Sequence, residues 1–228
     1  MAEKSDKTKM GQSVWLKPVK PEREVPALSK ERILDAALEI LDQQGLAGLT
    51  MRKLAQHLNA GAASLYWHVE TRDDVLELAL DAVLSEITYP SESDDWQVTL
   101  IAYMHEWRRV LLRHHWAPAL IGFRPFIGPN ALERSEYLRR ILMHSGLEAT
   151  DVIQAGYTLS NFMIGSVVTQ IAWQNGGGDN ARPQIKEFMQ AQTEKYPLLA
   201  SQMAYDSGDW DASYIKGLNW IIRSLNQI

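Results

Sequence analysis

The sequence predicts an all-α protein, with a three-helix helix-turn-helix domain near the N-terminus and a helical bundle after it. From Ser29 onward, apolar residues recur three and four positions apart, which is the period of an amphipathic helix. No stretch of alternating valine, isoleucine and threonine residues suggests a sheet. The 228 residues are 46% hydrophobic, which is sufficient for a sizeable core.

Composition excludes several classes of protein. The chain has no cysteine, so it can form neither a disulfide framework nor a thiolate zinc site. It has no apolar run long enough to span a membrane and no apolar stretch typical of a signal peptide, so we expect a cytoplasmic protein. Residues 1–28 are polar and rich in proline, and we predict a disordered tail there. This tail would be either a passive leader or a lysine-bearing arm that touches DNA.

The first predicted helix begins after Ser29, a residue type that favours the N-cap position. Its apolar residues fall on one face: Ile33, Ala36, Ala37, Ile40 and Leu41. Gly45 is expected to end this helix, because glycine readily adopts the left-handed conformation found at helix C-termini.

Two short helices follow, joined by a tight turn. Thr50 is expected to cap the first of them, whose apolar residues again share a face: Met51, Leu54, Ala55 and Leu58. The turn is formed by residues 59–61, in which asparagine and glycine tolerate left-handed backbone geometry. The second short helix is predicted over residues 62–68.

A fourth helix is predicted after Thr71, with Asp73 and Asp74 in its first turn, where the helix dipole favours acidic residues. Its apolar stripe ends near Ile87 and consists of Val75, Leu78, Ala79, Ala82 and Val83. We therefore assign residues 29–88 to the helix-turn-helix domain and its connecting helix.

The helical pattern is interrupted at residues 89–94 by the sequence YPSESD, and we place a domain boundary there. The second domain, residues 94–228, remains helical in period. Its predicted helices cover residues 96–114, 131–145, 149–173, 183–196 and 209–226.

Three adjacent side chains, Tyr66, Trp67 and His68, stand at the end of the second short helix. In a helix-turn-helix unit this helix enters the major groove, and donors at its far end can hold phosphates. Each of the three rings can donate one hydrogen bond. The alternative is that Tyr66 and Trp67 are core aromatics between two domains and that His68 is a surface residue. Three such rings in a row favour DNA binding.

The local charge supports this interpretation. The whole chain has a net charge of −5. Residues 50–72, however, contain the basic residues Arg52, Lys53 and Arg72 and a single acidic residue, Glu70.

Residues 29–88 resemble the DNA-binding domain of the TetR (tetracycline repressor) family. The matching stretch is ILDAALEILDQQGLAGLTMRKLAQHLNAGAASLYWHV. The resemblance implies that Arg52 reads a base or a nearby phosphate, that Ala63 and Ser64 touch bases or backbone, and that the aromatic run and Arg72 hold phosphates. The predicted DNA contacts are Thr50, Arg52, Lys53, Ala63, Ser64, Tyr66, Trp67, His68 and Arg72. Alanines at the start of this helix leave little hydrogen-bonding capacity, so specificity would depend on Arg52, Lys53, Ser64 and contact with thymine methyls.

Residues 94–226 resemble the C-terminal domain of the same family more loosely, through WRRVLLRHHW, RPFIGPNALE and YTLSNFMIGSVV. The resemblance implies a domain that binds an effector and forms dimers. The aromatics there, taken singly, fit a core; together with a few polar groups they fit an apolar pocket. The candidate effector contacts are Met104, His105, Trp107, Phe123, Phe126, Tyr157, Asn161, Phe162 and Trp173.

No cofactor, metal site or catalytic residue is expected. In the tetracycline repressor a histidine four residues before an Arg-Pro pair helps to ligate the drug's magnesium. Leu120 stands at that spacing from Arg124 here, so we do not expect a magnesium–tetracycline effector. His114 and His115 are adjacent on a helix and point apart, which argues against a shared metal.

These observations predict a ligand-responsive repressor that binds a near-palindromic operator as a homodimer and releases it on binding a small hydrophobic or aromatic effector. The alternatives are a small-molecule carrier or enzyme on a helical bundle, and a regulator without an effector. No membrane partner is expected. The dimer interface is predicted in residues 151–173 and 209–226, with Trp220 and Ile221 as apolar anchors and small residues that permit close approach: Gly156, Gly165, Ser166 and Gly217. Otherwise these helices would form only the core of the monomer.

Overall fold

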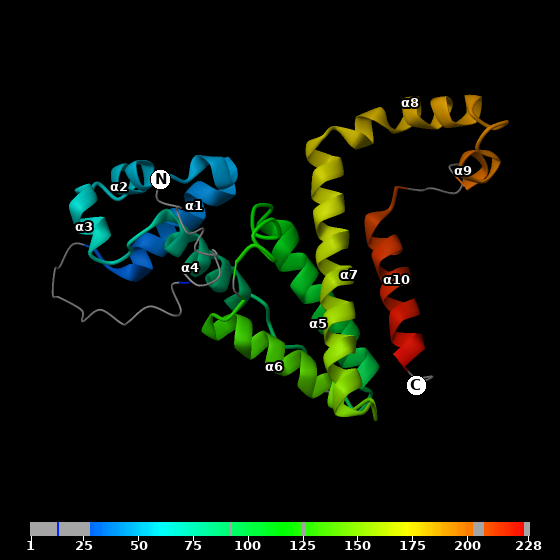
Figure 1. Cartoon of the computed structure of the whole chain (residues 1–228), viewed down its shortest axis with the longest axis horizontal. Helices are drawn as coiled ribbons and strands as arrows, with labels where there is room; N and C mark the ends of the chain where they lie inside the picture. Colours follow the sequence, from blue (N-terminus) through cyan, green and yellow to red (C-terminus); the bar gives the residue numbers. More distant parts are fainter. Residues whose placement is uncertain (1–12, 14–27, 92, 125, 203–207, 226–228) are drawn as a thin grey trace, which may run out of the picture. The chain divides into compact units, whose positions relative to one another are not determined.

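The computed structural model describes residues 13, 28–91, 93–124, 126–202 and 208–225 (Figure 1). Within these residues it has ten helices and no strand, apart from one isolated bridge between Ile121 and Arg124. The all-α prediction is therefore confirmed. The predicted disordered tail lies outside the described residues except for Ser13 and Leu28, as does Asn226 in the last predicted helix. In the described part, no helix combines the length and apolar character needed to cross a membrane.

The chain forms two compact units that divide between Gly146 and Leu147. The first unit contains α1 (Lys30–Gly48), α2 (Met51–His57), α3 (Ala62–Tyr66), α4 (Arg72–Ser85), α5 (Trp96–Arg113) and α6 (Pro129–Met143). The second contains α7 (Ala149–Asn175), α8 (Gly178–Ala191), α9 (Pro197–Gln202) and α10 (Trp210–Leu225).

Helix α1 begins as the sequence predicts. The Ser29 hydroxyl accepts a hydrogen bond from the Arg32 amide at 3.3 Å, and all five predicted apolar residues are buried. The predicted interruption at Gly45 is observed, since its φ of 65° and ψ of −171° are not helical. Beyond this break a short helical segment, which the sequence pattern did not predict, continues α1 to Gly48.

Helix α4 occupies the centre of the first unit, since α1, α5 and α6 all pack against it. Its predicted residues Val75, Ala79 and Val83 are buried, whereas Leu78 and Ala82 are only half-buried. A second row that the pattern did not single out is also buried, namely Leu76, Leu80 and Leu84. Because α4 also packs on helices that follow residue 94, the contacts do not divide at residues 89–94. The predicted boundary between functional domains stays a prediction.

Side chains of α4 and α6 form hydrogen bonds to the start of α6 and to the end of α4. Asp81 on α4 accepts hydrogen bonds from the Asn130 side chain and from the Ala131 amide, both at 2.9 Å, at the start of α6. Arg134 on α6 donates in return to the carbonyls of Leu84 and Ser85, at 3.1 and 3.2 Å. Burial lowers the pKa of Arg134, while Asp81 opposes that shift. The end of α4 is therefore fixed by charged side chains as well as by apolar packing.

In the second unit, α10 packs along α7. Phe162 of α7 stacks on Tyr214 of α10, with centroids 5.5 Å apart and planes inclined by 12°. Gly217 is required for this contact, because a Cβ there would lie 2.5 Å from the Phe162 ring. Gly217 therefore permits close approach within the protomer, whereas the sequence had suggested a role at a dimer interface. The predicted helix over residues 183–196 is observed as α8, which begins earlier and ends at Ala191, before α9.

Candidate DNA-binding site

The site is built on α2, α3 and the turn between them. Thr50 begins α2 with an extended backbone, and its hydroxyl accepts a hydrogen bond from the Lys53 amide at 3.1 Å. Leu54 and Ala55 are buried, so the opposite face of α2 carries the exposed Arg52 and Lys53. The Lys53 ammonium also donates to the Gln44 side chain of α1 at 2.9 Å.

The turn depends on one left-handed residue. Asn59 has a φ of 49°, and it is the only non-glycine residue with a positive φ among those described. Asparagine tolerates this geometry better than most side chains. Gly61 then takes an extended conformation and precedes α3. The predicted role of the asparagine in this turn is confirmed.

Helix α3 is shorter than predicted. It ends at Tyr66 because the Trp67 amide already bonds to the carbonyl of Ser64, and the His68 amide bonds to that of Leu65 at 3.0 Å. A five-residue helix cannot be stable alone. Leu65 and Val69, both buried, attach it to the rest of the unit.

The outer surface of this segment is open. Ala62, Ala63 and Ser64 are exposed, which leaves the backbone of α3 accessible to another molecule. Tyr66 and Trp67 are 47% and 64% exposed, and His68 is half-buried. Such values do not fit core aromatics. They fit side chains that meet a partner, as the DNA interpretation requires.

Arg72 lies differently from expectation. Its Nε donates to the Leu49 carbonyl at 2.7 Å, and its Nη2 donates to the Leu46 carbonyl at 2.5 Å. Both carbonyls belong to the last turn of α1 and the link to α2. Arg72 therefore fixes the position of α2, and the predicted phosphate contact remains a prediction for its other guanidinium donors.

Sequence reasoning missed the ion pairs that surround the start of α4. The buried Arg124 guanidinium lies 2.6 Å from a carboxylate oxygen of Asp73 and 4.0 Å from one of Glu77. The Ser13 hydroxyl donates to the other Glu77 oxygen at 2.6 Å. These contacts join residues 47 to 64 positions apart, so no local pattern signals them.

The predicted effector contacts in the first unit form an aromatic cluster on α5 and the loop before α6. Met104 and Trp107 are fully buried, and Phe126 stacks on Trp107 with a centroid distance of 6.3 Å and an angle of 16°. Within the described residues, the buried Nε1 of Trp107 has no hydrogen-bond acceptor. His105 is half-buried, and Phe123 is 72% exposed. Burial also raises the pKa of the neighbouring Tyr103.

The predicted effector contacts in the second unit separate into two sets. Phe162 and Trp173 face α10: Phe162 stacks on Tyr214, and the Trp173 ring lies 6.4 Å from that of Trp210. Tyr157 and Asn161 are instead exposed. They share one face of α7, at helical spacing, with the exposed residues Ile153, Gly165 and Val168.

Comparison with known proteins places these features in one family. A family described as "Bacterial regulatory proteins, tetR family" matches residues 33–79, and one described as "Tetracyclin repressor-like, C-terminal domain" matches residues 89–228. An HTH-type transcriptional regulator of Saccharopolyspora erythraea is 44% identical over 214 residues, which are 93% of this chain and 91% of that protein.

Two further relatives are similar over most of their length, at lower identity. The class A tetracycline repressor from transposon 1721 of Escherichia coli is 30% identical, over 87% of this chain and 90% of that protein. ActR of Streptomyces coelicolor, solved in complex with actinorhodin, is 32% identical with a TM-score of 0.79, over 87% of this chain and 96% of that chain. The chain therefore belongs to the TetR family of bacterial transcriptional regulators, and it is not an enzyme.

Proposed function

We propose that the protein is a cytoplasmic repressor that binds a near-palindromic operator as a homodimer and releases it when a small aromatic effector binds. The observation that carries the DNA-binding part is the exposed surface of α3 and the turn after it, where small residues precede Tyr66, Trp67 and His68. In a helix-turn-helix protein such a surface enters the major groove.

The roles of the basic side chains can be separated by experiment. Operator sequences would first be selected from random DNA, and affinities would then be measured at several salt concentrations. Arg52→Ala is expected to cost roughly 1–3 kcal/mol on the best sequence and to relax the preference at one base position. His68→Ala is expected to weaken binding to all sequences similarly, because a phosphate contact carries no sequence information.

The matched control is Arg140→Ala, which removes an exposed arginine on α6, outside the proposed interface. It should leave operator affinity unchanged. If Arg52→Ala binds as tightly as the parent at every salt concentration, the proposed position of α2 on DNA is wrong.

Dimerisation is supported by the apolar side chains that the second unit leaves exposed. On α7 these are Ile153, Tyr157 and Val168, and on α10 they are Ile215 and Trp220. Gly165 lies within the same face of α7, and apart from its own helix backbone no atom of the described residues lies within 4 Å of the position of a Cβ, so another helix could approach closely there. A second copy would bury this surface and place two recognition helices about 34–36 Å apart, one turn of DNA. Tyr157 and Asn161, on the same face, are then better placed for the partner than for an effector.

The proposed effector is aromatic, because Trp107 and Phe126 already offer stacked rings and the Trp107 indole N–H has no acceptor among the described residues. Two relatives agree with this class: ActR is solved with actinorhodin, and the class A protein of Escherichia coli is a tetracycline repressor. Fluorescence titration of the tryptophans with actinorhodin and other aromatic compounds would detect binding. Operator DNA should weaken effector binding by the same factor by which the effector weakens operator binding. A compound that binds tightly and leaves operator affinity unchanged would contradict the proposed release.

A further inference from the structure

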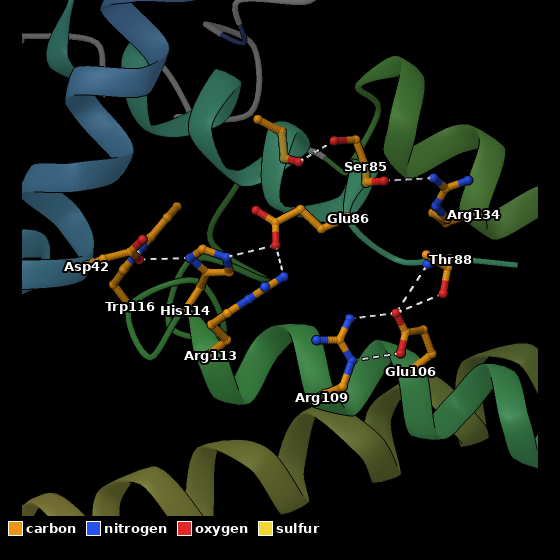
Figure 2. A network of polar contacts seen from close by, with 11 residues as sticks. Asp42, Ser85, Glu86, Thr88, Glu106, Arg109, Arg113, His114, Trp116 and Arg134 are labelled. Atoms are coloured by element: carbon orange, nitrogen blue, oxygen red, sulfur yellow. Dashed lines mark hydrogen bonds and ion pairs between the residues drawn. The ribbon is translucent and has the colours of Figure 1, made fainter.

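A buried histidine joins three elements of the first unit. The side chain of His114, at the end of α5, is only 7% exposed. Its Nδ1 lies 2.7 Å from Oδ1 of Asp42 on α1, and its Nε2 lies 3.2 Å from Oε2 of Glu86, which follows α4 (Figure 2). These three side chains form the Asp42–His114–Glu86 clasp.

The two carboxylate oxygens of the clasp each have a second donor. Oδ1 of Asp42 also accepts a hydrogen bond from Nε1 of Trp116 at 2.7 Å, and Oε2 of Glu86 is paired with Nη2 of Arg113. An ionised carboxylate only accepts hydrogen bonds, which is what both oxygens do here. A ring nitrogen without a proton would direct its lone pair at one of these acceptors, so the two short contacts favour an N–H at both ring nitrogens of His114. A neutral imidazole has a single N–H, whereas the imidazolium has two.

We propose that His114 is held as an imidazolium and that its charge fixes α1 to the ends of α4 and α5, so that the orientation of the DNA-binding helices depends on pH. The consequence for operator binding rests on the function proposed above, whereas the charge of the ring does not. The charged groups around the ring are Asp42 from α1, Glu86 from the end of α4 and Arg113 from α5. Arg109, one helical turn before Arg113, also interacts electrostatically with Glu86.

The direction of the pH effect follows from the donors. When the ring loses a proton, one nitrogen presents a lone pair to a carboxylate, and the clasp retains only one of its two bonds. The clasp is thus complete at lower pH and is lost as pH rises. Helix α1 packs on α2 and on α4, and Lys53 of α2 bonds to Gln44 of α1. A change at Asp42 therefore reaches the DNA-binding helices through direct contacts.

The first test needs no DNA. The full-length protein would be labelled with ¹⁵N in its histidines, and the His114 signals would be assigned by their loss in His114→Gln. Both ring nitrogens are expected to be protonated at neutral pH. A spectrum with one protonated and one unprotonated nitrogen at neutral pH would overturn the proposal.

The second test measures operator affinity from neutral to alkaline pH. Parent protein is expected to lose about tenfold in affinity, the factor for one lost charge-assisted hydrogen bond, and His114→Gln should show little further loss over the same range. His115→Gln is the matched control, because His115 is adjacent and exposed, and it should behave as the parent does. If His114→Gln keeps the pH dependence of the parent, the switch is refuted.

Asp42→Asn provides a second variant should His114→Gln unfold, since it keeps an oxygen acceptor and removes the charge. It should lower the affinity at neutral pH and reduce the pH dependence; parent-like behaviour in both respects would count against the clasp. If the parent binds no DNA sequence at all, the proposed function fails, while the nitrogen spectrum still decides the charge of His114.

Discussion

Arg72 shows how a single side chain can position the helices of the candidate DNA-binding site through bonds within the protein. Its two hydrogen bonds to the carbonyls of Leu46 and Leu49 link the start of α4 to the segment between α1 and α2. These carbonyls have lost their regular helical partners, so a guanidinium that bonds to both of them stabilises the link.

Arg72→Ala is expected to lower the free energy of unfolding by about 1.5–3 kcal/mol, because a charged donor to two carbonyls is removed. Chemical denaturation would measure this loss. Arg72→Lys serves as the control for charge, since an ammonium keeps the charge and lacks the planar fork; it should recover only part of the stability. Equal stability of Arg72→Ala and the parent would show that these bonds contribute nothing.

Leu65 and Tyr66 are neighbours with opposite environments. Leu65 is completely buried, while Tyr66 is 47% exposed. Leu65→Ala is expected to cost about 2–5 kcal/mol in stability, as for other buried leucines, and to abolish operator binding because α3 loses its anchor.

Tyr66→Ala should change stability by less than about 0.5 kcal/mol and still weaken DNA binding, since Tyr66 is an exposed residue outside the core. Thermal unfolding and operator titration of the two variants would separate anchoring from contact. If Tyr66→Ala were as destabilising as Leu65→Ala, the exposed position of the ring would be wrong.

At the scale of elements, the segment after α4 is tied to α5 by one carboxylate. Glu106 accepts two hydrogen bonds from the Arg109 guanidinium, both at 2.7 Å, and one from the Thr88 hydroxyl at 3.0 Å (Figure 2). The bonds from Arg109, followed by those from Thr88, lower the pKa of Glu106 to about 2, although burial opposes them.

This depressed pKa makes the tie sensitive to acid. Because the folded pKa lies below the unfolded value of about 4.3, the contribution of Glu106 is complete above that value and is lost as pH falls toward 2. Glu106→Gln should therefore be less stable than the parent at neutral pH, by about 1–2 kcal/mol once the exposure of Arg109 is allowed for, and the gap should close in acid. Chemical denaturation of both proteins at a series of pH values would measure this difference in stability. Glu136→Gln, an exposed position on α6, is the control and should show no such gap.

At the scale of the whole molecule, the prediction concerns assembly. Sedimentation at micromolar concentration is expected to show a species of twice 25.9 kDa. Trp220→Glu should shift it to the monomer, since Trp220 is 62% exposed on α10 and a buried unpaired charge is costly at an interface.

Leu132→Glu is the matched control for this experiment. Leu132 is 55% exposed on α6, outside the helices proposed for the interface, and its substitution should leave the dimer intact. A parent protein that sediments only at 25.9 kDa would exclude the dimer, and a dimer that survives Trp220→Glu would place the interface elsewhere.

The sequence by itself determined the features that depend on a few neighbouring residues. The caps at Ser29, Thr50 and Thr71 are all observed, and the one at Thr71 is completed by Asp74. The same holds for the left-handed Asn59 and for the buried face of α1. Such features follow from side chains that bond within one turn of helix and from the 3.6-residue period, so a short stretch contains the whole cause. The family could also be identified, because its motif is contiguous.

Only the tertiary structure decided what depends on distant residues. Asp42 and His114 are 72 positions apart, and nothing local indicates that they meet. The sequence predicted a phosphate contact for Arg72, which stays a prediction, and it did not indicate that the fold brings two carbonyls of another segment to the same guanidinium. The short helical segment between Gly45 and Gly48 and the second buried row of α4 likewise depend on what packs against them. Several side chains in the sequence could pair with each of these residues, and the packing of the helices determines which pairs form. The energies of burial and pairing arise only once the helices are together.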